Sequence, residues 1–170
     1  MEDHNQLLAE LNNTFSNLES AMQGFNEKTF NQKTEPNTWS AGMVTQHLIL
    51  AGTGLDQVLL GSTKTTSAPA DEKVAIIKNI FLNFDEKYSS PPFIEPADES
   101  YLKEEQLRKL KNIAHTIAVL LPNLDLSLTC LDFEFPGMGY LTRLELLSFL
   151  IYHTQRHTHQ LNELANNLNP

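Results

Sequence analysis

The sequence predicts an all-α protein, a four-helix bundle with a long crossover that carries a short extra helix between the second and third long helices. Two observations lead to this prediction. Apolar residues recur at helical spacing in four long stretches, as in helices that bury one face. A proline-rich segment separates the second stretch from the third, so a long connection joins these two helices. The 170 residues suit one domain, residues 1–170, with a substantial core.

The first long helix is predicted over residues 7–25, where seven apolar side chains share one stripe: Leu7, Leu8, Leu11, Phe15, Leu18, Met22 and Phe25. The second begins after Ser40, a typical N-cap residue, and Trp39 before it can pack on Val44. We expect the second helix to continue to about Gly61.

The crossover follows a polar connector, and residues 74–84 carry the apolar spacing of a short helix. The third long helix is predicted over residues 107–121, with Asp98 or Ser100 as its cap and Pro122 at its end. Between these helices, three prolines enforce an irregular path: Pro91, Pro92 and Pro96.

The last helix is predicted to begin at Thr142 and Glu145, which have the spacing of a capping box, and to run almost to Pro170. Residues 126–129 are too short an extended segment to predict a sheet. Residues 132–139 contain a proline and two glycines and are predicted to form a compact loop.

Composition excludes several classes of protein. The formal net charge is −9, without a basic patch, which argues against binding to nucleic acid or to an anionic membrane. No apolar run approaches the roughly 20 residues that cross a bilayer. The chain has one cysteine and no amino-terminal apolar segment of the kind that directs secretion, so we expect a cytoplasmic location.

Two histidines in the last helix carry the functional prediction. At 100° per residue, His157 lies about 40° from His153, and Leu146 and Leu150 fall within about 60° of it, so both imidazoles face the core. His159 falls at about 240°, toward solvent. Two imidazoles one turn apart can share a metal ion, which would satisfy one nitrogen of each buried ring.

A third histidine, His47, lies on the core stripe of the second helix. Its neighbours Ala51 and Gly54 are small and suggest a pocket beneath the ring. Trp39, at the start of the helix, could line this pocket or serve only as a packing anchor. Three neutral imidazoles leave a fourth position open, as in reactive rather than structural zinc sites.

Alternatives remain open at this stage. A histidine on an apolar face is often a hydrogen-bonded core residue, so all three could be structural. Gln160 falls about 20° from His153 on the wheel. It could orient a ligand or substrate, or it could bridge helices.

Three segments together resemble the DinB-like superfamily of metal-binding four-helix bundles. They are Trp39-Ser40 leading to His47, the stretch from Phe135 to Thr142, and His153-x-x-x-His157-x-x-Gln160-Leu161. The resemblance covers most of the chain. One departure is that Arg156-His157 stands where an adjacent histidine pair is often found in this superfamily.

The resemblance implies that His47, His153 and His157 bind a divalent ion, with waters completing the shell. Three imidazoles suit zinc, nickel, copper and iron alike, and of these we expect zinc or nickel. Its characterised members include enzymes that use low-molecular-weight thiols, such as mycothiol-dependent isomerases and bacillithiol S-transferases. A small-molecule substrate, a thiol cosubstrate and a homodimer are therefore expected.

Three functions are compatible with such a site. A metal-bound thiol is deprotonated and could attack an electrophile, as in a thiol S-transferase or isomerase. A metal-bound water could instead hydrolyse a substrate. The ion could also clamp two helices without turnover, as in a non-catalytic binding or stress-response module.

Overall fold

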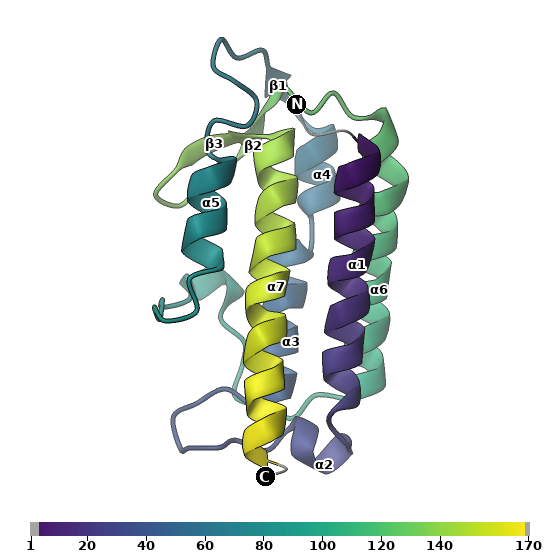
Figure 1. Cartoon of the computed structure of the whole chain (residues 1–170), viewed down its shortest axis with the longest axis vertical. Coiled ribbons are helices and arrows are strands. Elements are labelled where there is room, and N and C mark those ends of the chain that lie inside the picture. Colours follow the sequence, from purple (N-terminus) through teal and green to yellow (C-terminus); the bar gives the residue numbers. More distant parts are fainter. Residues whose placement is uncertain (1–3, 169–170) are drawn as a thin grey trace.

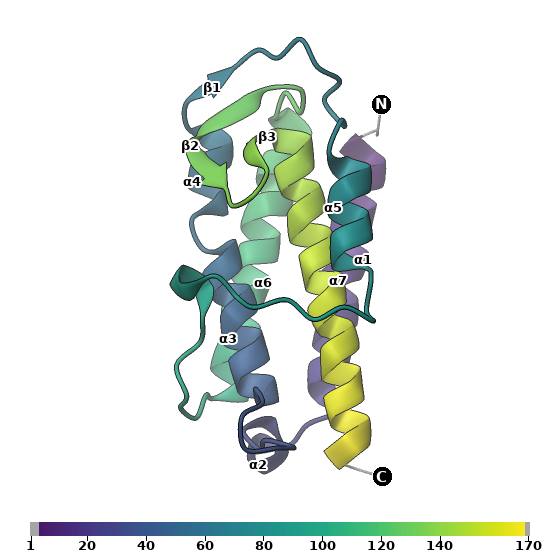
Figure 2. The ribbon, with the colours of Figure 1, turned by 90° about the vertical axis from the view of Figure 1, so that its left-hand side faces the viewer.

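The computed structural model describes residues 4–168, which are mostly helical (Figure 1). Four long helices run alongside one another (Figures 1 and 2). Helix α7 packs against α1 and α3, and α6 packs against the same two helices, so the four surround one interior. Their bounds are α1 His4–Gln23, α3 Ala41–Gly52, α6 Lys103–Leu120 and α7 Arg143–Leu168.

Shorter helices complete the chain. Helix α5 lies against the outer side of α7, and α2 lies at the end of the molecule opposite the strands (Figure 1). The short elements are α2 Glu27–Phe30, α4 Leu55–Leu60, α5 Val74–Phe81 and the 3-10 helices η1 Pro92–Ile94 and η2 Leu121–Asn123. The short helix predicted within the crossover is therefore present as α5, whereas α2 was not predicted.

A three-stranded antiparallel sheet corrects the prediction of an all-α fold. It has the order β1-β2-β3 and is formed by β1 Thr63–Lys64, β2 Thr129–Phe135 and β3 Gly139–Thr142. In β2 the exposed Asp132 and Glu134 alternate with partly buried apolar residues, a two-residue period that favours a strand. Gly137 and Gly139 adopt positive φ angles of 76° and 70° at the turn into β3.

Two predicted helix starts agree with the structure and one does not. The Ser40 hydroxyl accepts a hydrogen bond from the backbone N–H of Met43, at 3.2 Å. Thr142 and Glu145 form the predicted capping box, because each side chain accepts a bond from the other's backbone N–H. Helix α6, however, begins after Leu102 without a side-chain cap, so neither Asp98 nor Ser100 caps it.

The second predicted helix is divided in two, which corrects its expected continuation to Gly61. Helix α3 ends at Gly52, and α4 begins at Leu55. Gly54 between them has a φ of 81°, in the left-handed region that glycine adopts without steric cost. Helix α4 then leads into the short strand β1.

The interior contains two hydrophobic clusters. The sheet-end cluster includes Leu11 of α1 and extends along α7 as far as Tyr152. The α2-end cluster includes Leu18 of α1, and the first α7 residue that belongs to it is Leu161. Polar side chains occupy the interval between the two clusters on α1 and α7. We call this group, together with the facing histidine of α3, the polar layer: Thr14, His47, His153, Gln155 and His157.

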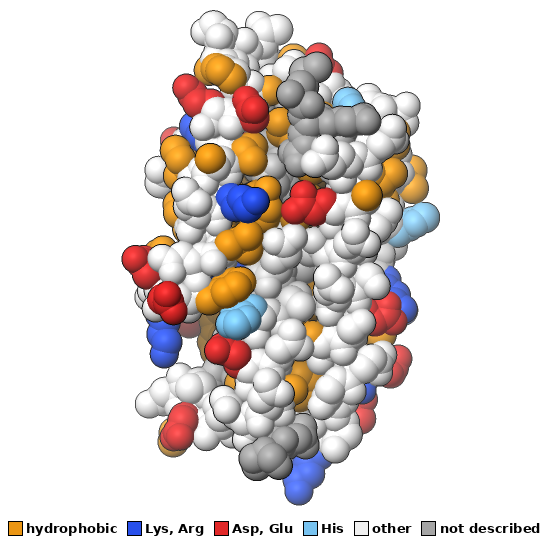
Figure 3. Space-filling view, viewed as in Figure 1, with side chains coloured by type: hydrophobic (Ala, Val, Ile, Leu, Met, Phe, Trp, Pro, Cys, Tyr) orange, Lys and Arg blue, Asp and Glu red, His pale blue; other side chains and the backbone are white. Residues whose placement is uncertain are grey.

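On the side of the molecule that Figure 3 shows, acidic and basic side chains are not separated into patches. There Lys and Arg side chains stand apart from one another and are interspersed with acidic ones. None of the helices in residues 4–168 combines the length and the apolar character needed to span a membrane.

Candidate metal centre

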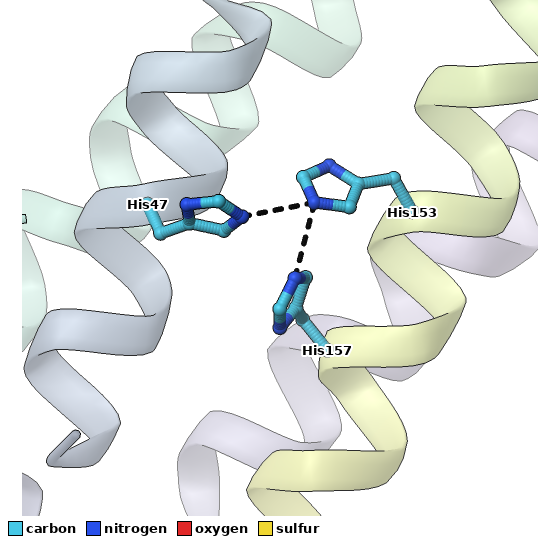
Figure 4. A group of neighbouring side chains, drawn as sticks. All are labelled: His47, His153 and His157. Atoms are coloured by element: carbon cyan, nitrogen blue, oxygen red, sulfur yellow. Dashed lines mark hydrogen bonds between the residues drawn. The ribbon is translucent and has the colours of Figure 1, made fainter. Parts of the chain in front are cut away.

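The side chains of the three predicted histidines converge in the space between α3 and α7 (Figure 4). His47 projects from α3, and His153 and His157 project from α7, so that their Nε2 atoms face one another. The Nε2 atom of His153 lies 2.9 Å from that of His47 and 3.1 Å from that of His157. One ring nitrogen from each residue lies within 4.8 Å of the other two. All three residues are buried, with exposed fractions of 3%, 4% and 8% for His47, His153 and His157.

Partners on the far side of two rings determine which nitrogen carries the proton. The Nδ1 atom of His47 lies 2.8 Å from the backbone carbonyl of Ile94, which can only accept, so Nδ1 donates. The Nδ1 atom of His157 lies 2.8 Å from Oε1 of Gln160 and donates in the same way. Since a neutral imidazole carries one proton, both rings present an Nε2 lone pair to the centre.

His153 cannot satisfy these lone pairs by hydrogen bonding alone. A neutral His153 has one N–H, which can point at His47 or at His157 but not fully at both. Its own Nδ1 is buried without a hydrogen-bond partner. A purely hydrogen-bonded triad therefore leaves at least one buried acceptor unsatisfied, at a cost of about 1–3 kcal/mol.

A metal ion fits this donor set. An ion bound tetrahedrally at about 2.0–2.1 Å separates its ligand nitrogens by about 3.3 Å, close to the observed spacings of 2.9 and 3.1 Å. The three Nε2 lone pairs would then share one cation. The Nδ1 atoms of His47 and His157 bond to the Ile94 carbonyl and the Gln160 side chain, and such bonds orient ligand imidazoles in metal sites.

Burial keeps the imidazoles neutral, the state that binds metal. Desolvation lowers the pKa of His157 to about 3 and lowers the pKa of His153 well below its usual value, and nearby His47 lowers both further. Desolvation also lowers the pKa of His47, although its bond to the Ile94 carbonyl opposes the shift. At neutral pH the uncharged form of each therefore predominates.

Aromatic side chains surround the triad. The His153 ring stacks on Phe149, with ring centroids 5.0 Å apart, and meets Phe81 edge-on at 5.3 Å. The Trp39 ring lies 5.1 Å from that of His47. Among residues 4–168, the cluster that could hold an ion contains these three histidines and no carboxylate. The surroundings of the site are thus mainly apolar.

The structure places the other predicted site residues differently. Trp39 and Gln160 contact the triad through His47 and His157 respectively. Ala51 lies one turn further along α3 and is partly buried. Gly54 lies beyond the end of that helix, where its conformation serves the break between α3 and α4. A pocket lined by Ala51 and Gly54 stays a prediction.

Sequence reasoning missed two contributions to the site. The Ile94 carbonyl comes from η1 in the crossover, and a backbone group leaves no mark in a sequence pattern. Arg156 was noted as a departure from the superfamily pattern, yet its guanidinium donates hydrogen bonds to backbone carbonyls of the crossover. The crossover itself passes in front of α7 and α3 at the middle of the molecule (Figure 2).

Comparisons with known proteins give no further guidance on the site. Neither the scan against protein-family models nor the searches of curated proteins and of solved structures found a match.

Proposed function

We propose that the protein binds one divalent metal ion through His47, His153 and His157, and that it is a DinB-like four-helix-bundle protein. The convergence of three Nε2 atoms, two of them fixed as lone-pair donors, is the observation that supports metal binding most strongly. The packing of α1, α3, α6 and α7 around one interior is compatible with the DinB-like assignment. Zinc or nickel is the proposed ion, since both accept imidazole ligands.

The proposed activity is the transfer or isomerisation of a thiol-bound small molecule. His47, His153 and His157 would hold the ion and leave a position open, and the charge of the ion would favour the deprotonated form of a thiol bound there. The thiolate sulfur then forms a bond to an electrophilic carbon of the substrate, while the leaving group departs with the electron pair of the bond that breaks. A small cytoplasmic thiol and a homodimer belong to this proposal.

The composition of the site favours a thiolate over a metal-bound water. A hydrolase with a metal-bound water commonly uses a carboxylate as a general base, and the described metal cluster contains none. A thiol needs no such base once the ion has displaced its proton to solvent. The aromatic rings of Phe81, Phe149 and Trp39 also offer apolar contacts to a substrate.

A non-catalytic clamp is the second candidate, and the burial of the site favours it. All three histidines are less than 10% exposed, and they join α3 to α7. An ion shared by these helices would stabilise the packing even without a substrate.

Cobalt substitution tests the transferase proposal. Cobalt(II) would replace the native ion, and candidate low-molecular-weight thiols would be titrated while the charge-transfer absorption of a cobalt–thiolate bond is followed. The proposal predicts a new absorption band and metal-dependent thiol consumption with an electrophile, both lost in His47→Ala. An unperturbed spectrum together with turnover of an ester or amide would identify a hydrolase. An unperturbed spectrum without any turnover would identify a clamp.

A further inference from the structure

The Arg156 guanidinium donates its hydrogen bonds to backbone carbonyls in and just before a loop, and not to an acidic side chain. Its Nη1 donates to the backbone carbonyl of Asn83 at 2.8 Å and to that of Phe81 at 3.4 Å, and its Nη2 donates to the carbonyl of Glu86. The guanidinium also lies over the ring of Tyr88, 5.1 Å from the centroid. Arg156 therefore fixes the first part of the segment between α5 and η1. We call residues 82–94 the strap.

The second part of the strap is fixed at His47. The Ile94 carbonyl accepts the Nδ1 hydrogen bond of this ligand, and the Ser90 hydroxyl lies 3.4 Å from the same nitrogen. Pro91, between Ser90 and η1, has an extended backbone, and Pro92 is the first residue of η1. One end of the strap is thus held by α7 and the other by α3, the two helices that carry the histidines.

The strap has little internal structure to hold it in place. Apart from η1, residues 82–94 form no helix or strand, so their backbone hydrogen bonds provide little local stability. Ordering such a segment costs conformational entropy, which specific anchors must offset. A charged donor that joins two strap carbonyls, those of Asn83 and Glu86, to the Phe81 carbonyl at the end of α5 is a strong anchor of this kind.

We infer that Arg156 is a positioning residue for the metal centre. It lies on α7 between the ligands His153 and His157 and holds the strap across the site, where the strap's Ile94 carbonyl orients the third ligand, His47. The strap shields the ion from solvent, and its release is the step that lets the ion exchange. This inference rests on the proposed metal site.

Arg143 offers a matched control. It also donates to backbone carbonyls, with Nε 2.7 Å from the carbonyl of Leu59 and Nη1 3.3 Å from that of Asp125. It is the first residue of α7, about 15 Å along the helix from His153 at 1.5 Å per residue. Its removal should weaken the fold through the same type of interaction without freeing the strap.

The test compares zinc release from the wild-type protein with release from Arg156→Met and Arg143→Met. Each zinc-loaded protein is mixed with excess chromogenic chelator, and amide hydrogen exchange of residues 82–94 is measured in parallel. Arg156→Met should release zinc at least about tenfold faster than the wild type, with faster exchange in the strap, because three hydrogen bonds to a charged donor are lost. Arg143→Met should release zinc at the wild-type rate.

Arg156→Lys provides a second variant that preserves the charge. Its ammonium cannot reach all three carbonyls, so its release rate should lie between those of the wild type and Arg156→Met. If Arg156→Met does not fold, this variant supports the inference by releasing zinc faster than Arg143→Met. Release at the wild-type rate from either folded Arg156 variant, or equal acceleration in Arg143→Met, would overturn the inference. A wild-type protein that binds no zinc or other divalent ion would instead refute the proposed function and this inference with it.

Discussion

Two consecutive parts of α7 both bury side chains but differ in chemistry. From Leu144 to Tyr152 the helix contributes mainly apolar side chains to the sheet-end cluster, where removal from water stabilises the fold directly. From His153 to His157 it buries two imidazoles, whose desolvation costs free energy unless each nitrogen finds a partner. The first part is explained by packing alone. The second part is explained by a ligand, because a purely hydrogen-bonded triad leaves at least one Nε2 lone pair without a partner. The Nδ1 atom of His153, on the other side of its ring, is also without a hydrogen-bond partner, and an ion at the Nε2 atoms would not supply one.

The largest expected effect is on stability and comes from an apolar cluster beyond the polar layer. Phe30→Ala removes a fully buried ring from the α2-end cluster and should lower the free energy of unfolding by about 3–5 kcal/mol. The folded variant should still bind one ion, because the triad does not include this ring. Urea unfolding and metal analysis together measure both quantities. Loss of metal from a folded Phe30→Ala protein would show that metal binding by the triad depends on the packing of the α2-end cluster.

A smaller effect is expected from the partner of a ligand. Gln160→Leu removes the acceptor of the His157 Nδ1 proton, so metal affinity should fall by about 10–100-fold while the stoichiometry is unchanged. Competition against a chelator of known affinity measures this change. Gln155→Leu is the matched control, because Gln155 bonds to Thr14 and not to a histidine. An equal loss of affinity in the control would mean that Gln160 has no specific role.

The metal-free protein should lose stability as the pH falls below about 6.5, the pKa of an unfolded histidine. Above this pH the triad is neutral in both states and adds no pH dependence. Below it the unfolded chain binds protons that the folded chain does not, because burial lowers the pKa of His157 to about 3. Each histidine that stays neutral contributes a slope of about 1.4 kcal/mol per pH unit.

Urea unfolding of the metal-free protein at pH 7, 6 and 5 measures this slope, and His157→Leu provides the comparison. The variant lacks one such histidine and should show a shallower loss of stability. Equal slopes in the two proteins would contradict the assignment of a neutral, buried His157.

The sequence was most informative where a periodic pattern specifies the structure. Helical spacing predicted the long helices and placed His153 and His157 on the buried face, where the structure has them. Ser40 and the pair of Thr142 and Glu145 marked two helix starts correctly, because capping is local chemistry.

The errors have physical causes. The compact loop predicted over residues 132–139 is wrong, because residues 132–135 belong to β2 and only the turn before β3 is a loop. Residues 131–135 alternate as in a strand, but the pairing that makes them one depends on distant segments. Gly54 has open space beside it, as predicted, but the sequence did not show that its positive φ also ends one helix before another begins. The Ile94 carbonyl and the bonds of Arg156 to the strap follow from how the crossover lies in space, which residue spacing does not encode.

Metal analysis of three purified proteins tests the central claim most directly. The wild type, His153→Ala and His159→Ala would each be exposed to zinc or nickel, desalted and assayed for bound metal. His159 is the control because it stacks on Phe84 outside the triad. We predict about one ion per chain in the wild type and in His159→Ala, and a loss of stoichiometric binding in His153→Ala. Equal metal content in the two variants would contradict the assignment of the histidine triad as the metal site.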